Sequence, residues 1–323
     1  MQDQDNINRA KLYDDQVNLR ELFQILWRRK IFIIFLTLSF SILAIFYSFS
    51  LPNIYESETL LAPADESSIF SSSGSQDLSG LAGLAGISIP SQETGSNSKK
   101  AIEMIDSLSF FENKIMPNIF LPDLMAVKFW DLKENKIIYD DDIFIEDSNK
   151  WVRDFTFPRK LIPSAQESHE VFLQNHFSLS EDNSTSYVSL TIRHQSPFIA
   201  KQWTELIVEE INSFYRNKDK VQAEKAVVYL NNQLAKTSFS EIKQVTASLL
   251  QKEIQKLTLI EVNENYVFEY IYPPDAMEEK AEPSRILIVL FLTFLGCVLS
   301  IIIVLSMQYF SIERKQELKK INN

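Results

Sequence analysis

Two long uncharged segments stand near the two ends of the chain and dominate its pattern of hydrophobic and polar residues. Ile31 to Phe49 contains no charged residue, and neither does the 25-residue stretch from Ile286 to Phe310. A hydrocarbon core of about 30 Å requires roughly 20 residues of helix. The pattern therefore predicts two transmembrane helices, at residues 31–50 and 285–310, and a membrane as the immediate partner of the chain.

A cleaved signal peptide is the alternative interpretation of the first segment, because a basic cluster also precedes it. The segment is longer than the apolar core of a typical signal peptide, and the nearest small-x-small site, Ala62-Pro63-Ala64, lies too far downstream. We therefore expect an uncleaved anchor. Basic residues flank both segments on their terminal sides, which predicts that residues 1–30 and 311–323 are cytoplasmic.

Between the two segments, alternating hydrophobic and polar residues predict several short strands. They are expected at residues 55–61, 172–180, 187–194 and 265–272. The second and third of these are expected to pair, and the first, middle and last can meet in one sheet.

Helical spacing predicts three further elements. An amphipathic pattern covers residues 17–27, a second covers residues 99–115, and the longest runs without proline or glycine from 198 to 236. A helix to about residue 259 follows, and Ser238 and Glu241 fit a capping box at its start. The predicted fold is α+β, with a base that carries an antiparallel helical arm at residues 198–259.

Three prolines mark the approach to the second apolar segment. Pro273, Pro274 and Pro283 disfavour helix at and before their positions, so an extended connector is expected between the last strand and the span. The three prolines are also candidate contacts in assembly or with a partner.

Two other regions lack regular periodicity. Residues 67–98 contain eleven serines and five of the six glycines, which predicts a flexible loop, and no Lys-Ser or Lys-Thr follows to make it a phosphate loop. Residues 117–163 combine aromatic and acidic side chains. The aromatic residues could stack on sugars, but packing residues on a solvated loop are the favoured interpretation. They are Phe129, Trp130, Trp151, Phe155 and Phe157.

Composition and charge exclude several classes of function. The net charge is -11, and residues 52–284 hold 36 acidic and 21 basic residues, so a nucleic-acid partner is not expected. Cys297 is the single cysteine, and the spacing of His169, His176 and His194 fits no zinc signature. Neither a nucleotide-binding motif nor a catalytic constellation is present. The sequence therefore predicts a protein that is not an enzyme and needs no cofactor or metal.

Gly296 and Ser300 form a small-x-x-x-small pair within the second apolar segment. Such pairs allow helices to approach closely, so these residues are candidate contacts with a polymerase or a neighbouring protomer. The alternative is that they face lipid.

The order of these segments resembles the polysaccharide co-polymerase family, the Wzz-type chain length determinant proteins of bacterial surface polysaccharide pathways. The stretches that carry the resemblance are VNLRELFQILWRRK, YESETLLAPA, LSGLAGLAGIS, SPFIAKQWTELIVEEINSFYR, AVVYLNNQLAKTSFSEIKQVTASLLQKEIQKLTL and NYVFEYIYPPDAMEEKAEPSR. The resemblance implies an inner-membrane protein whose periplasmic α/β base, residues 51–284, carries a helical arm. It also implies a bell-shaped homo-oligomer that acts with a membrane polymerase on a growing glycan and modulates its length. The chain resembles the branch that lacks a kinase.

Two alternatives remain open at the level of sequence. One is a two-span periplasmic receptor or adaptor, although the chain has no cytoplasmic signalling domain. The other is an export adaptor that works with a separate tyrosine kinase.

Overall fold

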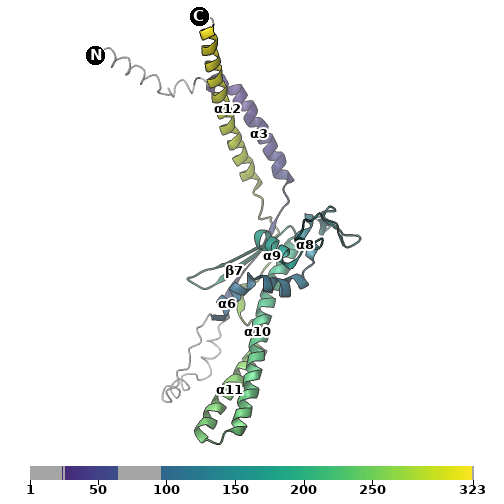
Figure 1. The fold of residues 1–323 in the computed structure, drawn as a ribbon, viewed down its shortest axis with the longest axis vertical. Coiled ribbons are helices and arrows are strands. Elements are labelled where there is room, and N and C mark those ends of the chain that lie inside the picture. The colour runs from purple at the N-terminus through teal and green to yellow at the C-terminus, as the bar shows by residue number, and fades with distance from the viewer. Residues whose placement is uncertain (1–23, 25, 65–95, 322–323) are drawn as a thin grey trace, which may run out of the picture. The chain divides into compact units, whose positions relative to one another are not determined.

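The computed structural model describes residues 24, 26–64 and 96–321, which fall into two compact units (Figure 1). One unit contains the described residues up to Pro52 together with those from Pro283 onward, and the other runs from Asn53 to Glu282. The predicted amphipathic pattern at 17–27 and the Ser/Gly-rich segment 67–98 lie largely outside the described residues.

The first unit is a pair of helices, α3 (Lys30–Ser50) and α12 (Arg285–Ile321). Lys30–Ser50 and Arg285–Gln308 are both long and apolar enough to cross a membrane, with mean hydropathies of 2.4 and 3.1. Only 11% of each span is buried within the protein. A core helix of a soluble protein would bury most of such a surface, so this exposure favours two membrane helices.

The second unit is built on a four-stranded sheet in the order β6-β7-β1-β8, in which every neighbouring pair is antiparallel. Its strands are β1 (Tyr55–Pro63), β6 (Phe177–Glu181), β7 (Val188–His194) and β8 (Phe268–Tyr272). The structure thus confirms that the first, middle and last predicted strands share one sheet. The domain is α+β, as the sequence predicts.

Alternation along the central strands explains why one face of this sheet is buried. In β7 the side chains of Val188, Leu190 and Ile192 are buried, while the residues between them are partly exposed. β1 alternates in the same way and pairs with β7 so that Thr59 lies opposite Leu190. Because side chains on a strand point alternately to the two faces, this register places the apolar set on a single face.

The first third of α10 (Pro197–Lys236) covers that face of the sheet. Ala200, Trp203, Ile207 and Ile211 recur at intervals of three or four residues and are all buried. This spacing forms one stripe along a helix, so the stripe packs onto β1 and β7. Burial of this stripe orients the helix, and the remaining two thirds of α10 continue past the sheet (Figure 1).

Asn212 joins the end of this buried stripe to strand β8. Its Oδ1 accepts hydrogen bonds from the backbone N–H groups of Val267 and Phe268 at 2.7 and 2.9 Å, and its Nδ2 donates to the Phe268 carbonyl at 3.0 Å. Asn212 itself is buried. One amide side chain therefore satisfies three backbone groups at the start of β8, and we call this set of bonds the Asn212 clamp.

Helix α11 (Ser240–Val262) returns along α10 and completes the arm. Three residues connect the two helices, and Thr237 closes α10 by donating from its hydroxyl to the Gln233 carbonyl. The predicted capping box is wrong: the N-cap is Phe239, and no side chain caps this helix start. Helix α11 begins one residue later than the capping pattern requires, so Ser238 lies in the connection between the two helices.

Two predicted elements are divided in the structure. Residues 99–115 form α6 (Ser96–Ile105), α7 (Leu108–Phe110) and the wide helical turn η1 (Phe111–Ile115) in place of one helix. Ser107 causes the division, because its hydroxyl donates to the Met104 carbonyl and accepts from the Phe110 N–H. A side chain that bonds nearby backbone groups competes with a continuous helix.

The second divided element is the strand predicted at 172–180. Residues Phe172–His176 form the wide helical turn η3, which follows α9 (Ala165–Val171), and β6 begins only at Phe177. Phe172 is buried against Phe111, with ring centroids 5.3 Å apart. This contact between segments distant in the sequence determines the helical turn, and a local alternating pattern does not contain it.

Residues 117–163 form a small second core. The elements are η2 (Met116–Asn118), α8 (Leu121–Met125), β2 (Val127–Asp131), β3 (Lys136–Tyr139), β4 (Phe144–Ile145) and β5 (Lys150–Trp151). The strands make two short hairpins, and Phe144 packs against Trp151 with centroids 5.3 Å apart. Of the aromatic residues that the sequence analysis names here, Trp151 packs into this core, as expected. Phe129, Phe155 and Phe157 are exposed, so the packing interpretation does not hold for them.

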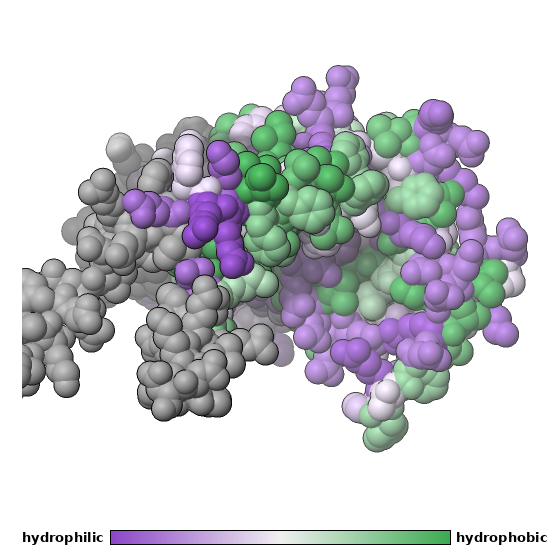
Figure 2. Space-filling view, turned by 90° about the horizontal axis from the view of Figure 1, so that it is seen from above, coloured by the Kyte–Doolittle hydropathy of each residue, from purple (hydrophilic) through white to green (hydrophobic). Residues whose placement is uncertain are grey.

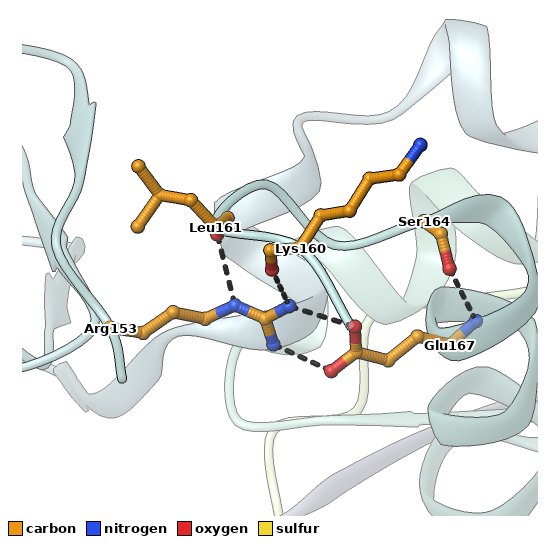
Figure 3. A network of polar contacts seen from close by, with 5 residues as sticks. All are labelled: Arg153, Lys160, Leu161, Ser164 and Glu167. Carbon is orange, nitrogen blue, oxygen red and sulfur yellow. Dashed lines mark hydrogen bonds and ion pairs between the residues drawn. The ribbon is translucent and has the colours of Figure 1, made fainter. Parts of the chain in front are cut away.

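A largely buried ion pair fixes the end of this region, as Figure 3 shows. The Arg153 guanidinium contacts both carboxylate oxygens of Glu167, at 2.5 and 2.7 Å, and also donates to the carbonyls of Lys160 and Leu161. These bonds hold the pKa of the Glu167 carboxyl below its ordinary value. A bidentate pair of this kind has a defined geometry, so it fixes the loop between the two residues.

The Asn212 clamp generates a stability prediction. In Asn212→Ala, three backbone groups at the start of β8 lose the hydrogen bonds of this side chain, so the free energy of unfolding should fall by about 2–4 kcal/mol. Asn217→Ala is the matched control, because Asn217 is exposed further along α10. Thermal unfolding of the full-length protein in detergent, followed by circular dichroism, measures both. Equal melting temperatures for the two variants would contradict a stabilising role of the clamp.

Candidate functional site

The helical arm presents apolar side chains to solvent. Ile242, Val245 and Leu249 recur at helical spacing on α11 and are each between 42 and 54% exposed. Val221 and Val228 are similarly exposed on α10. The apolar stripe of a helix is normally buried against another element, whereas these five residues are exposed. We call them the arm face and regard it as a candidate interface.

Polar contacts hold the two helices of the arm together near its root. Lys220 of α10 makes an ion pair with Glu261 of α11, and the Tyr266 hydroxyl donates to Asp219 at 2.7 Å. The ion pair is exposed and contributes little free energy by itself. Together with the Asn212 clamp, however, the two contacts fix where α11 leaves α10 and enters β8.

Two histidines, the buried His194 and the half-buried His176, lie beside Trp203 at the start of α10. The rings of His194 and His176 are 5.1 and 5.6 Å from the Trp203 ring, and 5.6 Å from one another. His194 accepts at Nδ1 from the Ser196 N–H, so its Nε2 carries the proton that is donated to the Asp123 carbonyl at 2.9 Å.

Burial accounts for the protonation state of this pair. It lowers the pKa of His194 to about 4 and also lowers that of His176, because a charged imidazole would lose its hydration. Both rings are therefore neutral at pH 7. Neutral His194 can accept the N–H of Ser196, whose own carbonyl accepts the first bond of α10. The pair thus positions the helix start.

The remaining histidine makes different contacts. His169 bonds the Asp106 carbonyl and packs near Phe111. Among the described residues, no group of three or more His, Cys, Asp or Glu side chains is placed to hold a metal ion. Asp123 is half-buried, and burial raises the pKa of its carboxyl, which accepts from Tyr139 at 2.6 Å. That bond joins α8 to β3.

The predicted small pair of the second span lies against the first span of the same chain. A Cβ atom placed on Gly296 would stand 2.5 Å from the Cβ of Phe40 on α3, so only glycine permits this approach. Ser300 is fully buried, with its hydroxyl 3.5 Å from that of Thr37. The lipid-facing alternative is therefore wrong, because α3 covers both residues. A contact with a polymerase or neighbouring protomer stays a prediction.

The proline-rich connector has the extended form that the sequence predicts. All of its residues are described, and they include no helix between β8 and Arg285; Pro274 is buried while Pro273 is exposed. Just before Pro283, the chain pairs with Ile54, whose N–H donates to the Glu282 carbonyl at 2.9 Å. The two ends of the sheet domain therefore lie side by side. The role of the three prolines in assembly stays a prediction.

Comparison with known proteins finds a family that matches the N-terminal third of the chain. The model of the family "Wzz: Chain length determinant protein" matches residues 15–116, which include α3 and β1. This match confirms the resemblance to the Wzz family. The kinase-less branch of Wzz proteins remains a prediction for this chain.

Two solved structures are similar to this chain at 12% sequence identity each. One, "full-length bacterial polysaccharide co-polymerase", covers 91% of this chain and 98% of its own, with a TM-score of 0.40. The other, "Fragment of WzzB, Polysaccharide Co-polymerase from Salmonella Typhimurium", covers 71% and 100%, with a TM-score of 0.28. No curated protein matches the chain.

Sequence reasoning missed the residues that position the arm. Asn212 lies next to Ile211 within the apolar stripe of α10, and a polar residue at such a position is the signal that could have found it. Its partners are backbone groups 55 and 56 residues away, which no local pattern specifies. The contacts of His194 with Trp203 are likewise absent from local periodicity.

The contact between α3 and α12 generates a cross-linking prediction. In a Cys297→Ser background, Thr37→Cys and Ser300→Cys should form a disulfide within one chain, because the two hydroxyls they replace are 3.5 Å apart. Adding Gly296→Ala should slow this cross-link, since the new methyl group would push against Phe40. Mass spectrometry of the oxidised protein measures the yield.

Ser306→Ala is the control, because Ser306 is exposed on the same helix. If the cross-link forms at the same rate with and without the Gly296→Ala substitution, α3 and α12 do not approach closely at Gly296.

Proposed function

We propose that this protein regulates the chain length of a bacterial surface polysaccharide and does not catalyse polymerisation itself. The observation that carries the proposal is the match of residues 15–116 to the chain length determinant family. The described structure adds two candidate spans and a domain with a helical arm, an arrangement suited to a scaffold. The glycan would be an O-antigen, a capsule or an exopolysaccharide.

The proposed location is the bacterial cytoplasmic membrane, with both termini in the cytoplasm and residues 51–284 in the periplasm. Basic residues support this orientation, since Arg28, Arg29 and Lys30 precede the first span and four more follow the second. The pairing of Ile54 with Glu282 also supports it, because both ends of the domain must reach the same membrane face.

We further propose that several copies assemble through the arm face. Its aliphatic side chains are exposed in the single chain, and their removal from water would favour association. A ring of copies would present one surface to a membrane polymerase and to the glycan that it extends. Such a scaffold would act by positioning, which requires no nucleophile or general base on the chain.

Deletion of the gene in its own bacterium tests the function. Glycans extracted from the mutant should still contain the repeat unit, but their length distribution on gels should lose its preferred range. The wild-type gene supplied in trans should restore that range. An unchanged distribution in the deletion strain would contradict chain length regulation.

The same strain tests the arm face. Complementation with Leu249→Asp should fail to restore the preferred range, because a charge at this position opposes burial between copies. Gln251→Asp is the control, since Gln251 is an exposed polar residue on the same helix. Native mass spectrometry of both proteins should show fewer copies per assembly for Leu249→Asp alone. Full restoration by Leu249→Asp would exclude the arm face as an assembly surface.

A further inference from the structure

A short loop of the sheet domain presents several large apolar side chains to solvent. We call residues 155–162 the FTFPRKLI loop. Phe157 is 91% exposed, and Phe155, Leu161 and Ile162 are exposed as well. Single exposed apolar residues are common on protein surfaces, but four within eight positions form a patch that indicates an interaction site.

The exposure of this loop is a property of an ordered segment. Trp151 before it and Pro163 after it are both buried. Within it, the Arg159 N–H donates to the Thr156 carbonyl at 3.0 Å, and Arg153 binds the carbonyls of Lys160 and Leu161 (Figure 3). The structure therefore holds the phenylalanines outward, and an insertion into a partner would require little further ordering of the backbone.

The charge of the loop is opposite to that of its domain. Arg159 and Lys160 stand between Phe157 and Leu161, and residues 155–163 contain no acidic side chain, whereas residues 52–284 hold 36 acidic and 21 basic residues. Both basic residues are exposed. Aromatic and aliphatic side chains next to basic ones match the surface of a membrane that contains anionic lipids.

Packing connects the loop to the end of the sheet at which the chain enters. Trp151 packs on Phe144, which belongs to the same small core as Tyr139 on β3. The hairpin partner of β3 carries Trp130, whose ring lies 5.3 Å from that of Tyr55. Tyr55 is the first residue of β1 and follows the end of α3 by only five residues, so a short connector keeps it near the membrane.

Figure 2 shows a surface that includes hydrophobic residues side by side with hydrophilic ones. The FTFPRKLI loop and the arm face differ in composition, because the apolar residues of the loop are interleaved with two basic ones. The arm face consists of aliphatic residues at helical spacing, which suits another helix. The loop is short, aromatic and cationic, which suits a bilayer surface.

We propose that the FTFPRKLI loop docks on the bilayer that holds the two candidate spans, with Phe157 inserted below the headgroups and Arg159 and Lys160 bound to anionic lipid. The loop thereby makes a third contact of the protein with the membrane, in addition to α3 and α12. This proposal rests on the two spans and does not depend on chain length regulation.

Site-directed spin labelling of the full-length protein tests the docking. In a Cys297→Ser background, a label is attached at Phe157→Cys or at Asn183→Cys, an exposed position in the turn after β6. The protein is placed in nanodiscs of phosphatidylethanolamine and phosphatidylglycerol. Paramagnetic relaxation by oxygen, which concentrates in the bilayer, is compared with relaxation by a water-soluble nickel chelate.

The label at 157 should be exposed to oxygen and protected from nickel, whereas the label at 183 should be exposed to nickel. Arg159→Gln combined with Lys160→Gln should reduce the protection at 157 in these nanodiscs but leave it unchanged in nanodiscs of purely zwitterionic lipid. A label at Ile162→Cys measures oxygen and nickel accessibility at a second position of the same loop.

Two results would overturn the proposal. One is full nickel accessibility at both 157 and 162. The other is nickel protection that is accompanied by short label-to-label distances between copies in pulsed dipolar measurements, because the loop would then contact a second chain and not lipid. Length regulation can be intact in either case, so failure here is distinguishable from failure of the proposed function.

Discussion

Burial of the first third of α10 on the sheet is the interaction on which the rest of the domain depends. The helix has 40 residues and therefore measures about 60 Å, far longer than the sheet that it covers. Trp203 and Ile211 occupy the core, and the Asn212 clamp then fastens the helix to β8. The rest of α10 extends past the sheet as the arm, because the start of the helix is fixed on the sheet.

Buried polar groups in this domain serve to position elements. His194 binds the start of α10, Arg153 binds the carbonyls of a loop, and Asn212 binds the backbone of a strand. In each case the partners include backbone groups, and an unpaired backbone group in the interior would be costly. The lowered pKa of His194 follows from its burial, and the backbone bonds of this ring fix the start of α10.

Much of the fold follows from local periodicity, and the failures have specific physical causes. The two spans, β1, β7 and α10 all carry patterns several turns or residues long, and the structure has them near the predicted positions. Residues 172–176 and Ser107 depart from prediction because a tertiary contact and a side-chain bond override the local pattern. The small core around Phe144 and Trp151 has strands of two residues, too short for any periodicity.

The candidate site could be predicted only in part. Gly296 and Ser300 were recognisable as a close-packing pair, but the helix that they approach is α3, which sequence spacing cannot identify. The arm was visible as a length of helix, whereas its anchor at Asn212 was not. The proposed function would depend on the placement of surfaces, and such surfaces have no short sequence motif.

Reconstitution with a polymerase tests most directly whether this protein sets glycan length by itself. The membrane polymerase of the same pathway would be incorporated in proteoliposomes with lipid-linked repeat units, with and without the full-length protein. Mass spectrometry of the products gives the number of repeat units per chain. The account predicts that the protein narrows this distribution around a preferred length while the rate of repeat-unit consumption stays similar. An identical distribution with and without the protein would contradict it.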